Sequence, residues 1–116
     1  MHPQTIEINN LELTWYEGRS QGTPIVFLHG NSLSSEIFNE QFADPLLADH
    51  YRLIALDLPG HGESAHSDDP LKDYSIPGLV NHLVTFVEKM QLDKAVFVGH
   101  SLGGHLLIEA YPKLKD

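Results

Sequence analysis

Three continuous runs of apolar residues divide this chain and predict its strongest strands. The runs are Ile25–Leu28, Leu53–Leu56 and Ala95–Val98. Each is apolar at every position rather than at alternate positions, which is typical of strands covered on both faces of a parallel sheet. Because segments of helical spacing separate these runs, the pattern predicts an α/β fold with right-handed crossovers and helices on both faces of the sheet.

The start of the chain has a different pattern, which predicts a hairpin. Residues Thr5–Ile8 and Leu11–Tyr16 have strand character on either side of Asn9-Asn10, a favourable pair for a tight turn. In the second segment apolar side chains alternate with polar ones such as Thr14, which predicts a half-exposed strand. The sheet is therefore expected to begin antiparallel and to continue parallel.

Helical spacing is clearest over residues 76–90, where apolar side chains recur on one face. Ser75 is the expected N-cap of this helix. A weaker helix is predicted to start near Ser34, and Pro45 limits its length. Residues 68–70 have the composition of a solvated turn.

Composition narrows the classes of partner and chemistry. Seven basic and sixteen acidic residues give a net charge of −9, which argues against nucleic acid or an anionic membrane as partner. The absence of cysteine excludes disulfides and thiol chemistry. No signal-peptide pattern and no apolar run of about 20 residues is present, so a cytoplasmic location is expected. No histidine pair has metal-site spacing with supporting carboxylates, so neither a metal nor another cofactor is expected.

Three unusual loops follow the three apolar strands. They are His29–Ser32, Asp57–Ser64 and Gly99–Gly104. In open α/β sheets, ligands bind beyond the carboxyl ends of the strands, where these loops fall. The sequence therefore predicts a small-molecule site at that edge of the sheet.

The last of these loops has the form G-x-S-x-G and places Ser101 between a strand and a helix. This form is known for holding a nucleophilic serine on a sharp turn. Side chains at Gly99 and Gly103 would clash in so tight a turn, and Gly104 is expected to let the helix pack closely on a neighbouring strand. The helix is predicted to begin at about Ser101 and to end before Pro112, because the residue preceding a proline is biased away from helix.

Together these motifs carry a family resemblance. Phe27–Asn31, Asp57–Ser64 and Gly99–Gly104 resemble three signatures of the α/β-hydrolase fold family, in its order and spacing. The resemblance covers essentially the whole chain and lies with the serine-nucleophile branch. It implies that residues 1–116 form a single partial domain, equivalent to roughly the first five of the family's eight strands.

The resemblance also implies roles for individual residues. Ser101 would be the nucleophile, and the backbone N–H groups of Leu102 and Asn31 would form the oxyanion hole. His29, Gly30 and His100 are expected to lie against the substrate. His29 is also expected to brace the oxyanion loop by hydrogen bonding, and His100 to pack beside the serine turn.

Other residues invite alternative roles. Asp57 follows a buried strand and could be mistaken for the acid of a catalytic triad. The resemblance implies instead that it supports the glycine-rich loop that follows. His105 lies one helical turn after the serine and is expected to be a core or capping residue. His61 and His66 are expected on the rim of the site, without a spacing that identifies a general base.

The acid, the histidine and the cap region of the resembling family come from later segments than this chain contains. The chain is therefore expected to be incomplete, with residues 95–98 as an exposed apolar edge that favours aggregation. Three interpretations stay open: an inactive N-terminal piece of a serine hydrolase that needs a C-terminal segment, two copies that complete each other, or a non-catalytic binding module.

The motifs specify the mechanism more narrowly than the substrate. A serine rather than an aspartate at the turn argues against the haloalkane dehalogenases and epoxide hydrolases of the resembling family. A carboxylic ester is the broadest expectation. Hydrolysis of lactones, amides or carbon–carbon bonds, and haloperoxidase-like activity, stay open.

Overall fold

The structure, a computed structural model, describes residues 1–114 and begins with the predicted hairpin. Strands β1 (His2–Ile8) and β2 (Leu11–Glu17) pair antiparallel. Asn9 and Asn10 have φ values of 50° and 70°, the left-handed pair that a two-residue type I′ turn requires. The hairpin prediction is confirmed, and β1 begins earlier than expected.

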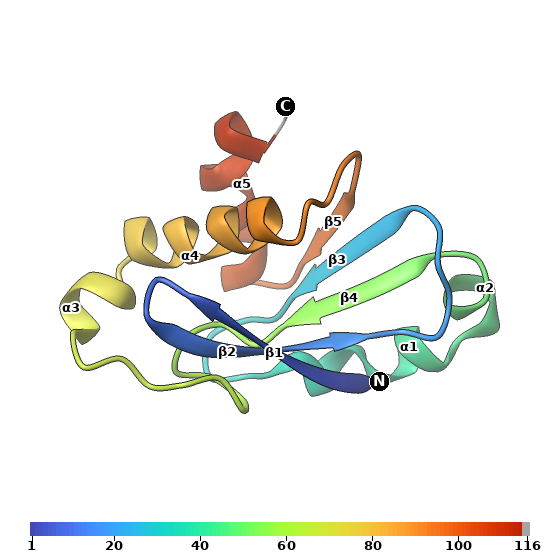
Figure 1. Cartoon of the computed structure of the whole chain (residues 1–116), viewed down its shortest axis with the longest axis horizontal. Helices are drawn as coiled ribbons and strands as arrows, with labels where there is room; N and C mark the ends of the chain where they lie inside the picture. Colours follow the sequence, from blue (N-terminus) through green and yellow to red (C-terminus); the bar gives the residue numbers. More distant parts are fainter. Residues whose placement is uncertain (115–116) are drawn as a thin grey trace.

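The three apolar runs form the rest of the sheet (Figure 1). They are β3 (Pro24–Leu28), β4 (Arg52–Leu56) and β5 (Val96–Gly99). The strand order is β1-β2-β4-β3-β5, with β3 parallel to both β4 and β5 and β2 antiparallel to β4. The predicted sheet, antiparallel at first and then parallel, is confirmed.

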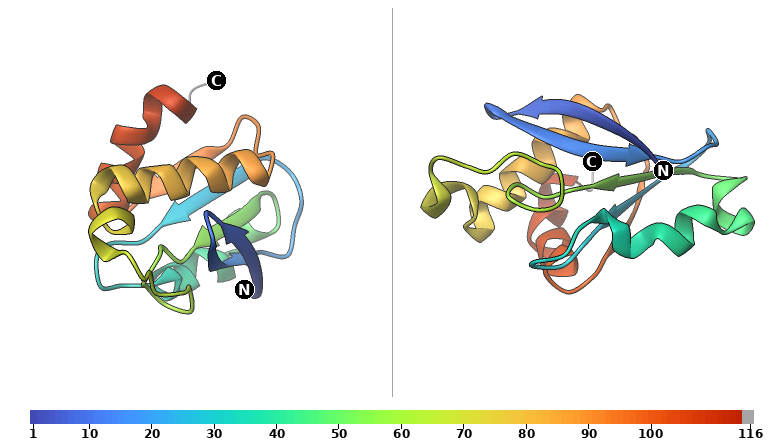
Figure 2. Two further views of the ribbon diagram at one scale, coloured as in Figure 1. Left: turned by 60° about the vertical axis from the view of Figure 1, so that its left-hand side comes forward. Right: turned by 90° about the horizontal axis from the view of Figure 1, so that it is seen from below.

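Helices cover both faces of this sheet, with α4 and α5 on one side and α1 and α2 on the other (Figure 2). Alternate residues of β3 and β4 therefore face two separate cores, which explains their continuous apolarity. None of the helices in the part of the chain that the structure describes could cross a membrane. The helical elements are η1 (Ser35–Phe38), α1 (Asn39–Ala43), α2 (Pro45–Ala48), α3 (Pro70–Asp73), α4 (Ile76–Lys89) and α5 (Leu102–Leu114).

The α4 prediction is confirmed, since the Ser75 side chain caps the helix by accepting the N–H of Gly78 at 3.1 Å. The weaker helix is divided into η1 and α1, and it ends at Ala43, before Pro45, as expected. Pro45 then begins a separate short helix, α2, with Asp44 as its N-cap. Residues 68 and 69 are exposed and non-helical, as expected of a solvated turn, and the short helix α3 begins after them with Pro70 in its first position.

Helix α5 begins within one residue of its predicted start and ends later than predicted. It starts at Leu102 because Ser101 has a left-handed φ of 54°. It continues through Pro112 to Leu114, where an end before the proline was expected. Pro112 removes an N–H only from the last turn, and Leu114 in that turn is partly buried against the core cluster that includes α4 residues.

His105 corrects a further expectation, because it is neither a core nor a capping residue. Its side chain is exposed, and Nε2 lies 3.7 Å from Glu109 Oε1, one turn further along α5. The helix instead buries Gly103, Leu106 and Ala110, which share another face.

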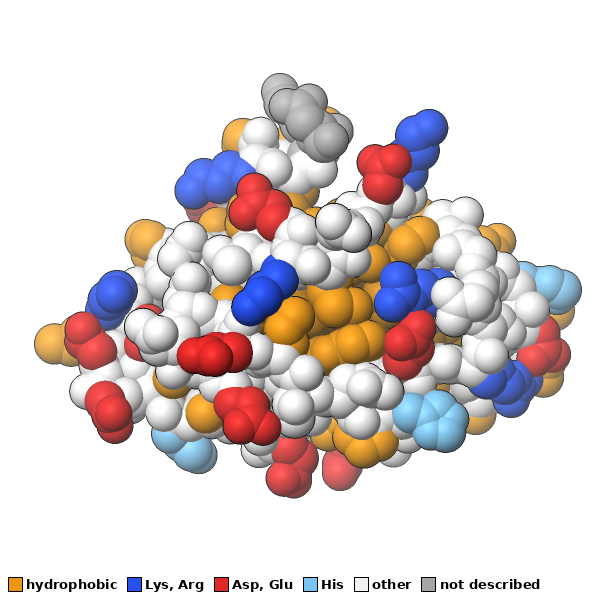
Figure 3. All heavy atoms as spheres, in the orientation of Figure 1, with side chains coloured by type: hydrophobic (Ala, Val, Ile, Leu, Met, Phe, Trp, Pro, Cys, Tyr) orange, Lys and Arg blue, Asp and Glu red, His pale blue; other side chains and the backbone are white. Residues whose placement is uncertain are grey.

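Strand β5 lies at the edge of the sheet and pairs with β3 alone in residues 1–114. Its Val96 and Val98 are 51% and 39% exposed. Hydrophobic side chains also gather in a hollow between α4 and the β1–β2 hairpin (Figure 3). The expected exposed apolar edge is confirmed.

Candidate active site

Ser101 lies on the tight turn between β5 and α5. Its φ of 54° is rare for a residue other than glycine, and its side chain is exposed. The turn is held by two hydrogen bonds of 2.9 Å, from the His100 N–H to the Leu28 carbonyl and from the Gly103 N–H to the His100 carbonyl. A strained backbone fixed in this way keeps the serine at the surface, where functional residues are often found.

Two glycines make this turn sterically possible, because a side chain at either position would clash with the backbone. A Cβ at Gly99 would lie 2.5 Å from the Gly104 nitrogen, and a Cβ at Gly103 would lie 2.3 Å from the Leu28 carbonyl oxygen. A Cβ at Gly104 would meet only the Gly99 oxygen at 3.5 Å, an ordinary contact. The close approach of the helix to a strand therefore depends on Gly103, and the expectation for Gly104 was wrong.

The loop after β3 lies directly against the serine turn. Gly30 is buried, and a Cβ there would lie 3.2 Å from Ser101 Cβ and 3.3 Å from His100 Cδ2. The Leu33 N–H donates to the Gly30 carbonyl at 3.2 Å and closes the loop into a turn. The fold thus brings together Gly30, His100 and Ser101, with exposed Asn31 immediately beside them.

The two backbone amides expected to bind an oxyanion flank this contact. Leu102 is the first residue of α5, and Asn31 lies in the turn after Gly30. Across residues 1–114, neither N–H donates to a backbone carbonyl. The N-terminus of α5 also carries the positive end of the helix dipole, which favours negative charge near Ser101.

His29 lies beneath the site rather than on its surface. It is 0% exposed, in contrast to the expectation that it would contact substrate. Its Nδ1–H donates to the Gly30 carbonyl at 2.7 Å, and its Nε2 accepts the Leu58 N–H at 3.0 Å. Both ring nitrogens are therefore engaged, and the ring braces the loop after β3 against the loop after β4.

Asp57 holds a second connection between these loops. The carboxylate is buried, with Oδ1 accepting the Ser35 N–H at 2.9 Å and Oδ2 accepting the Glu63 N–H at 3.0 Å. The Tyr16 hydroxyl donates to Oδ2 at 3.3 Å. This arrangement confirms that Asp57 supports the glycine-rich loop.

Sequence reasoning missed the contribution of β2 to this network. Ser64 Oγ accepts the Thr14 N–H at 2.8 Å and donates to the Asp57 carbonyl at 2.6 Å. Thr14 is consequently buried, which breaks the alternation expected along β2. No local signal marks the contact between Thr14 and Ser64, because these two residues lie fifty positions apart in the chain.

Tyr16 provides a pH-dependent test of the network. Burial is the main cause that raises the pKa of its phenol to about 12, and the Asp57 charge raises it further. Because this pKa lies above the usual 10.0, the contribution of Tyr16 to stability is complete below pH 10.0 and is lost as pH rises towards 12.

Ultraviolet titration of the tyrosines is expected to show a late ionisation phase near pH 12, and Tyr16→Phe should remove this phase. The exposed Tyr111 gives the control, since Tyr111→Phe leaves that phase in place; its persistence in Tyr16→Phe would contradict the assignment.

His61 and His66, in the loop after β4, do not belong to a metal-binding cluster in the described part of the chain. The His61 ring lies 5.0 Å from that of His29, and its Nδ1 is 2.9 Å from the Pro59 carbonyl oxygen. His66 is exposed. Over the described 114 residues, no three histidine or carboxylate side chains are grouped in a way that could hold a metal ion.

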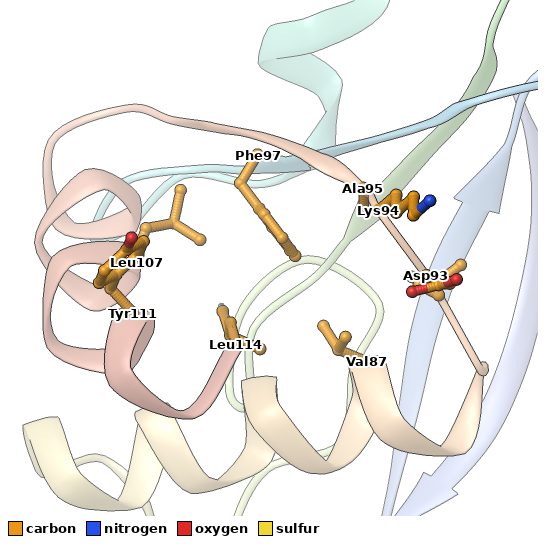
Figure 4. Close-up of a pocket in the computed structure, with 9 residues that line it drawn as sticks. Val87, Asp93, Lys94, Ala95, Phe97, Leu107, Tyr111 and Leu114 are labelled. Carbon is orange, nitrogen blue, oxygen red and sulfur yellow. The ribbon is translucent and has the colours of Figure 1, made fainter. Parts of the chain in front are cut away.

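A separate apolar cavity of about 440 Å³ lies between α4, β5 and α5. Phe97 points into it, facing Leu107 and Leu114, while Asp93 and Lys94 lie towards one side (Figure 4). The cavity is at the amino end of β5, whereas Ser101 follows the carboxyl end. It is therefore distinct from the serine site.

The architecture and the serine turn agree with a comparison against protein families. The family model described as alpha/beta hydrolase fold matches residues 23–115. The chain belongs to the α/β-hydrolase fold family. Its mixed sheet corresponds to the N-terminal part of that fold.

The chain is also similar to individual known proteins. A dihydrolipoyllysine-residue acetyltransferase component of an acetoin cleaving system from Pseudomonas putida is 39% identical over 88% of this chain and 26% of its own length. A serine hydrolase-like protein from Danio rerio is 38% identical over 85% of this chain and 30% of its own length. The N-acyl homoserine lactonase AidH, solved as a serine-to-glycine mutant with N-hexanoyl homoserine lactone, superposes with a TM-score of 0.93 at 31% identity, over 99% of this chain and 42% of its own. The chain thus spans less than half the length of each of these three proteins.

Proposed function

We propose that this chain carries the nucleophile of a serine hydrolase that works through an acyl-enzyme. The observation that carries the proposal is the exposed Ser101 at φ 54°, with Gly30 packed against its turn. Ser101 Oγ attacks a substrate carbonyl as its proton passes to a base, and the leaving group departs to give an ester on Oγ. Water then attacks this ester, which releases the acid and restores the hydroxyl.

The Leu102 and Asn31 amides are the proposed oxyanion donors. Both follow directly on residues that the fold holds at the serine turn. Donors placed before the reaction stabilise the charge that develops on the carbonyl oxygen without reorganising. One such donor is commonly worth about 10²–10³ in rate.

The substrate is proposed to be a small-molecule carboxylic ester or a related carbonyl compound. The likeness to AidH, at 31% identity, supports including cyclic esters in this class. A serine in the turn supports acyl transfer, since an activated hydroxyl is suited to attack on a carbonyl. The alternative is a binding module that uses the same loops at the carboxyl end of the sheet without turnover.

A serine-directed fluorophosphonate probe tests the nucleophile. We expect the complete protein to be labelled at Ser101 and the Ser101→Ala variant to remain unlabelled. Ser20→Ala is the matched control and should be labelled like the wild type, since Ser20 lies in the loop after β2. A complete, folded protein that takes up no probe would refute the hydrolase proposal and favour the binding module.

The base and the acid are proposed to come from a further polypeptide segment. His29 is not available as the base because it is buried with both nitrogens engaged. The exposed edge of β5 supports the addition of another strand, from a continuation of the chain or from a second copy. Either source would cover Val96 and Val98 and bring new loops to the carboxyl end of the sheet.

Strand addition from a second copy predicts self-association of the 116-residue chain. Sedimentation velocity at micromolar concentration should detect oligomers, and Val98→Lys should reduce them several-fold because a charge on an edge strand opposes pairing. The control is Leu71→Lys, at a position that is 93% exposed on α3, away from β5. A wild-type chain that sediments as a folded monomer would rule out the second copy as the source of the added strand.

A further inference from the structure

The loop that carries Asn31 is anchored to the neighbouring loop at both of its ends. At the first end, His29 Nε2 accepts the Leu58 N–H at 3.0 Å. At the other end, the Ser35 N–H donates to Asp57 Oδ1 at 2.9 Å. Because Asp57 and Leu58 are consecutive, both anchors meet at the end of β4. The position of the amide between them depends on both connections.

The first anchor permits a single protonation state of His29. A carbonyl oxygen only accepts, so the 2.7 Å contact with the Gly30 oxygen requires a proton on Nδ1. Nε2 accepts the Leu58 N–H and therefore carries no proton. The ring is fully buried, and water cannot replace either bond without local opening.

We propose that His29 is a positioning residue that acts as a proton-sensitive latch on the oxyanion loop. Its neutral form, with the proton on Nδ1, holds residues 30–34 against the end of β4. A proton on Nε2 would set a second donor against the Leu58 N–H, and that hydrogen bond is lost. The Asn31 amide is then anchored only through Asp57. This inference rests on the proposed function only in one respect, the role of the Asn31 amide as an oxyanion donor.

The surroundings of His29 determine the direction of the switch. The pKa of His29 is lowered below its usual 6.5, mainly because the ring is buried. The nearby His61 ring lowers this pKa further. The Gly30 carbonyl and the Asp57 carboxylate act in the opposite direction and raise it, but they do not outweigh burial. His100 lies on the other side of Gly30, on the serine turn. Because the folded state prefers neutral His29, the latch is closed above pH 6.5 and opens as pH falls through the lowered pKa.

Nuclear magnetic resonance of the chain labelled with ¹⁵N, alone or within a longer polypeptide, tests the latch without using catalysis. At neutral pH we expect the His29 nitrogens to report the Nδ1–H form. On acidification the Leu58 and Asn31 amide resonances should shift with the same midpoint as the His29 ring, below pH 6.5. An Nε2–H form at neutral pH would overturn the proposal, as would a His29 titration that leaves both amides unchanged.

Two variants separate positioning from general stability. In His29→Gln, a side-chain amide can still donate and accept but does not titrate, so the acid-dependent shift of the Asn31 amide should disappear. In His61→Gln, the shift should remain and its midpoint should rise, because His61 lowers the pKa of His29. If His29→Gln does not fold, the wild-type titration and His61→Gln still decide the matter. A normal titration with no probe labelling of Ser101 would refute the hydrolase proposal and leave the latch intact.

Discussion

Ser101→Ala is expected to reduce the proposed ester hydrolysis by about 10⁴-fold or more. The variant removes the only atom that can form the acyl-enzyme in the proposed mechanism. The loss should appear in kcat, because the hydroxyl acts in bond formation rather than in substrate binding. Steady-state kinetics with a chromogenic ester measures it.

The residual rate of Ser101→Ala is also informative. The Leu102 and Asn31 amides stay in place, so a weak acceleration over the uncatalysed reaction is expected to persist. Ser20→Ala should retain the wild-type kcat, because the loop after β2 is not part of the proposed mechanism. Turnover by Ser101→Ala at the wild-type rate would refute Ser101 as nucleophile.

Gly103→Val is expected to lower the free energy of unfolding by about 3 kcal/mol or more. A Cβ at this position would lie 2.3 Å from the Leu28 oxygen and 2.8 Å from the His29 oxygen, both of which are backbone atoms at the end of β3 and in the loop after it. Neither can move without displacing β3. Helix α5 must therefore shift away from the sheet, which also disturbs the serine turn that precedes it. Urea-induced unfolding measures the effect.

The adjacent glycine supplies a matched control for this prediction. A Cβ at Gly104 would have an ordinary 3.5 Å contact with the Gly99 oxygen. Gly104→Ala should therefore leave the fold intact and change stability by no more than about 1 kcal/mol, in the favourable direction, because alanine is the better helix former. Equal stability of Gly103→Val and the wild type would contradict the close packing of α5 on β3.

The sheet could be predicted because its signals are local. The three apolar runs became β3, β4 and β5, and Asn9-Asn10 became the turn of the hairpin. Helix α5 shows the limit of such signals. The rule that a helix ends before proline was overridden at Pro112 by packing of Leu114 against residues far away in the chain.

The sequence predicted the parts of the candidate site that form a short local motif. It did not predict the hydrogen bonds between residues that are distant in the chain. The glycine pattern identified the Ser101 turn, and the resemblance identified Asp57 as a support for its loop. The sequence did not reveal that Tyr16 donates to that carboxylate. Nor did it separate the bracing role of His29 from contact with substrate, because both roles place a histidine beside Gly30.

By itself, the sequence determined the strands, the two long helices α4 and α5, and the turn that holds Ser101, because apolar periodicity and glycine placement act over a few residues. Only the tertiary structure decided that Gly103 carries the close helix–strand contact and that His29 is buried with both nitrogens engaged. These features depend on hydrogen bonds and steric contacts between loops that are distant in the chain. The burial of a side chain and the partner it meets are properties of the packed sheet, and no short segment encodes them.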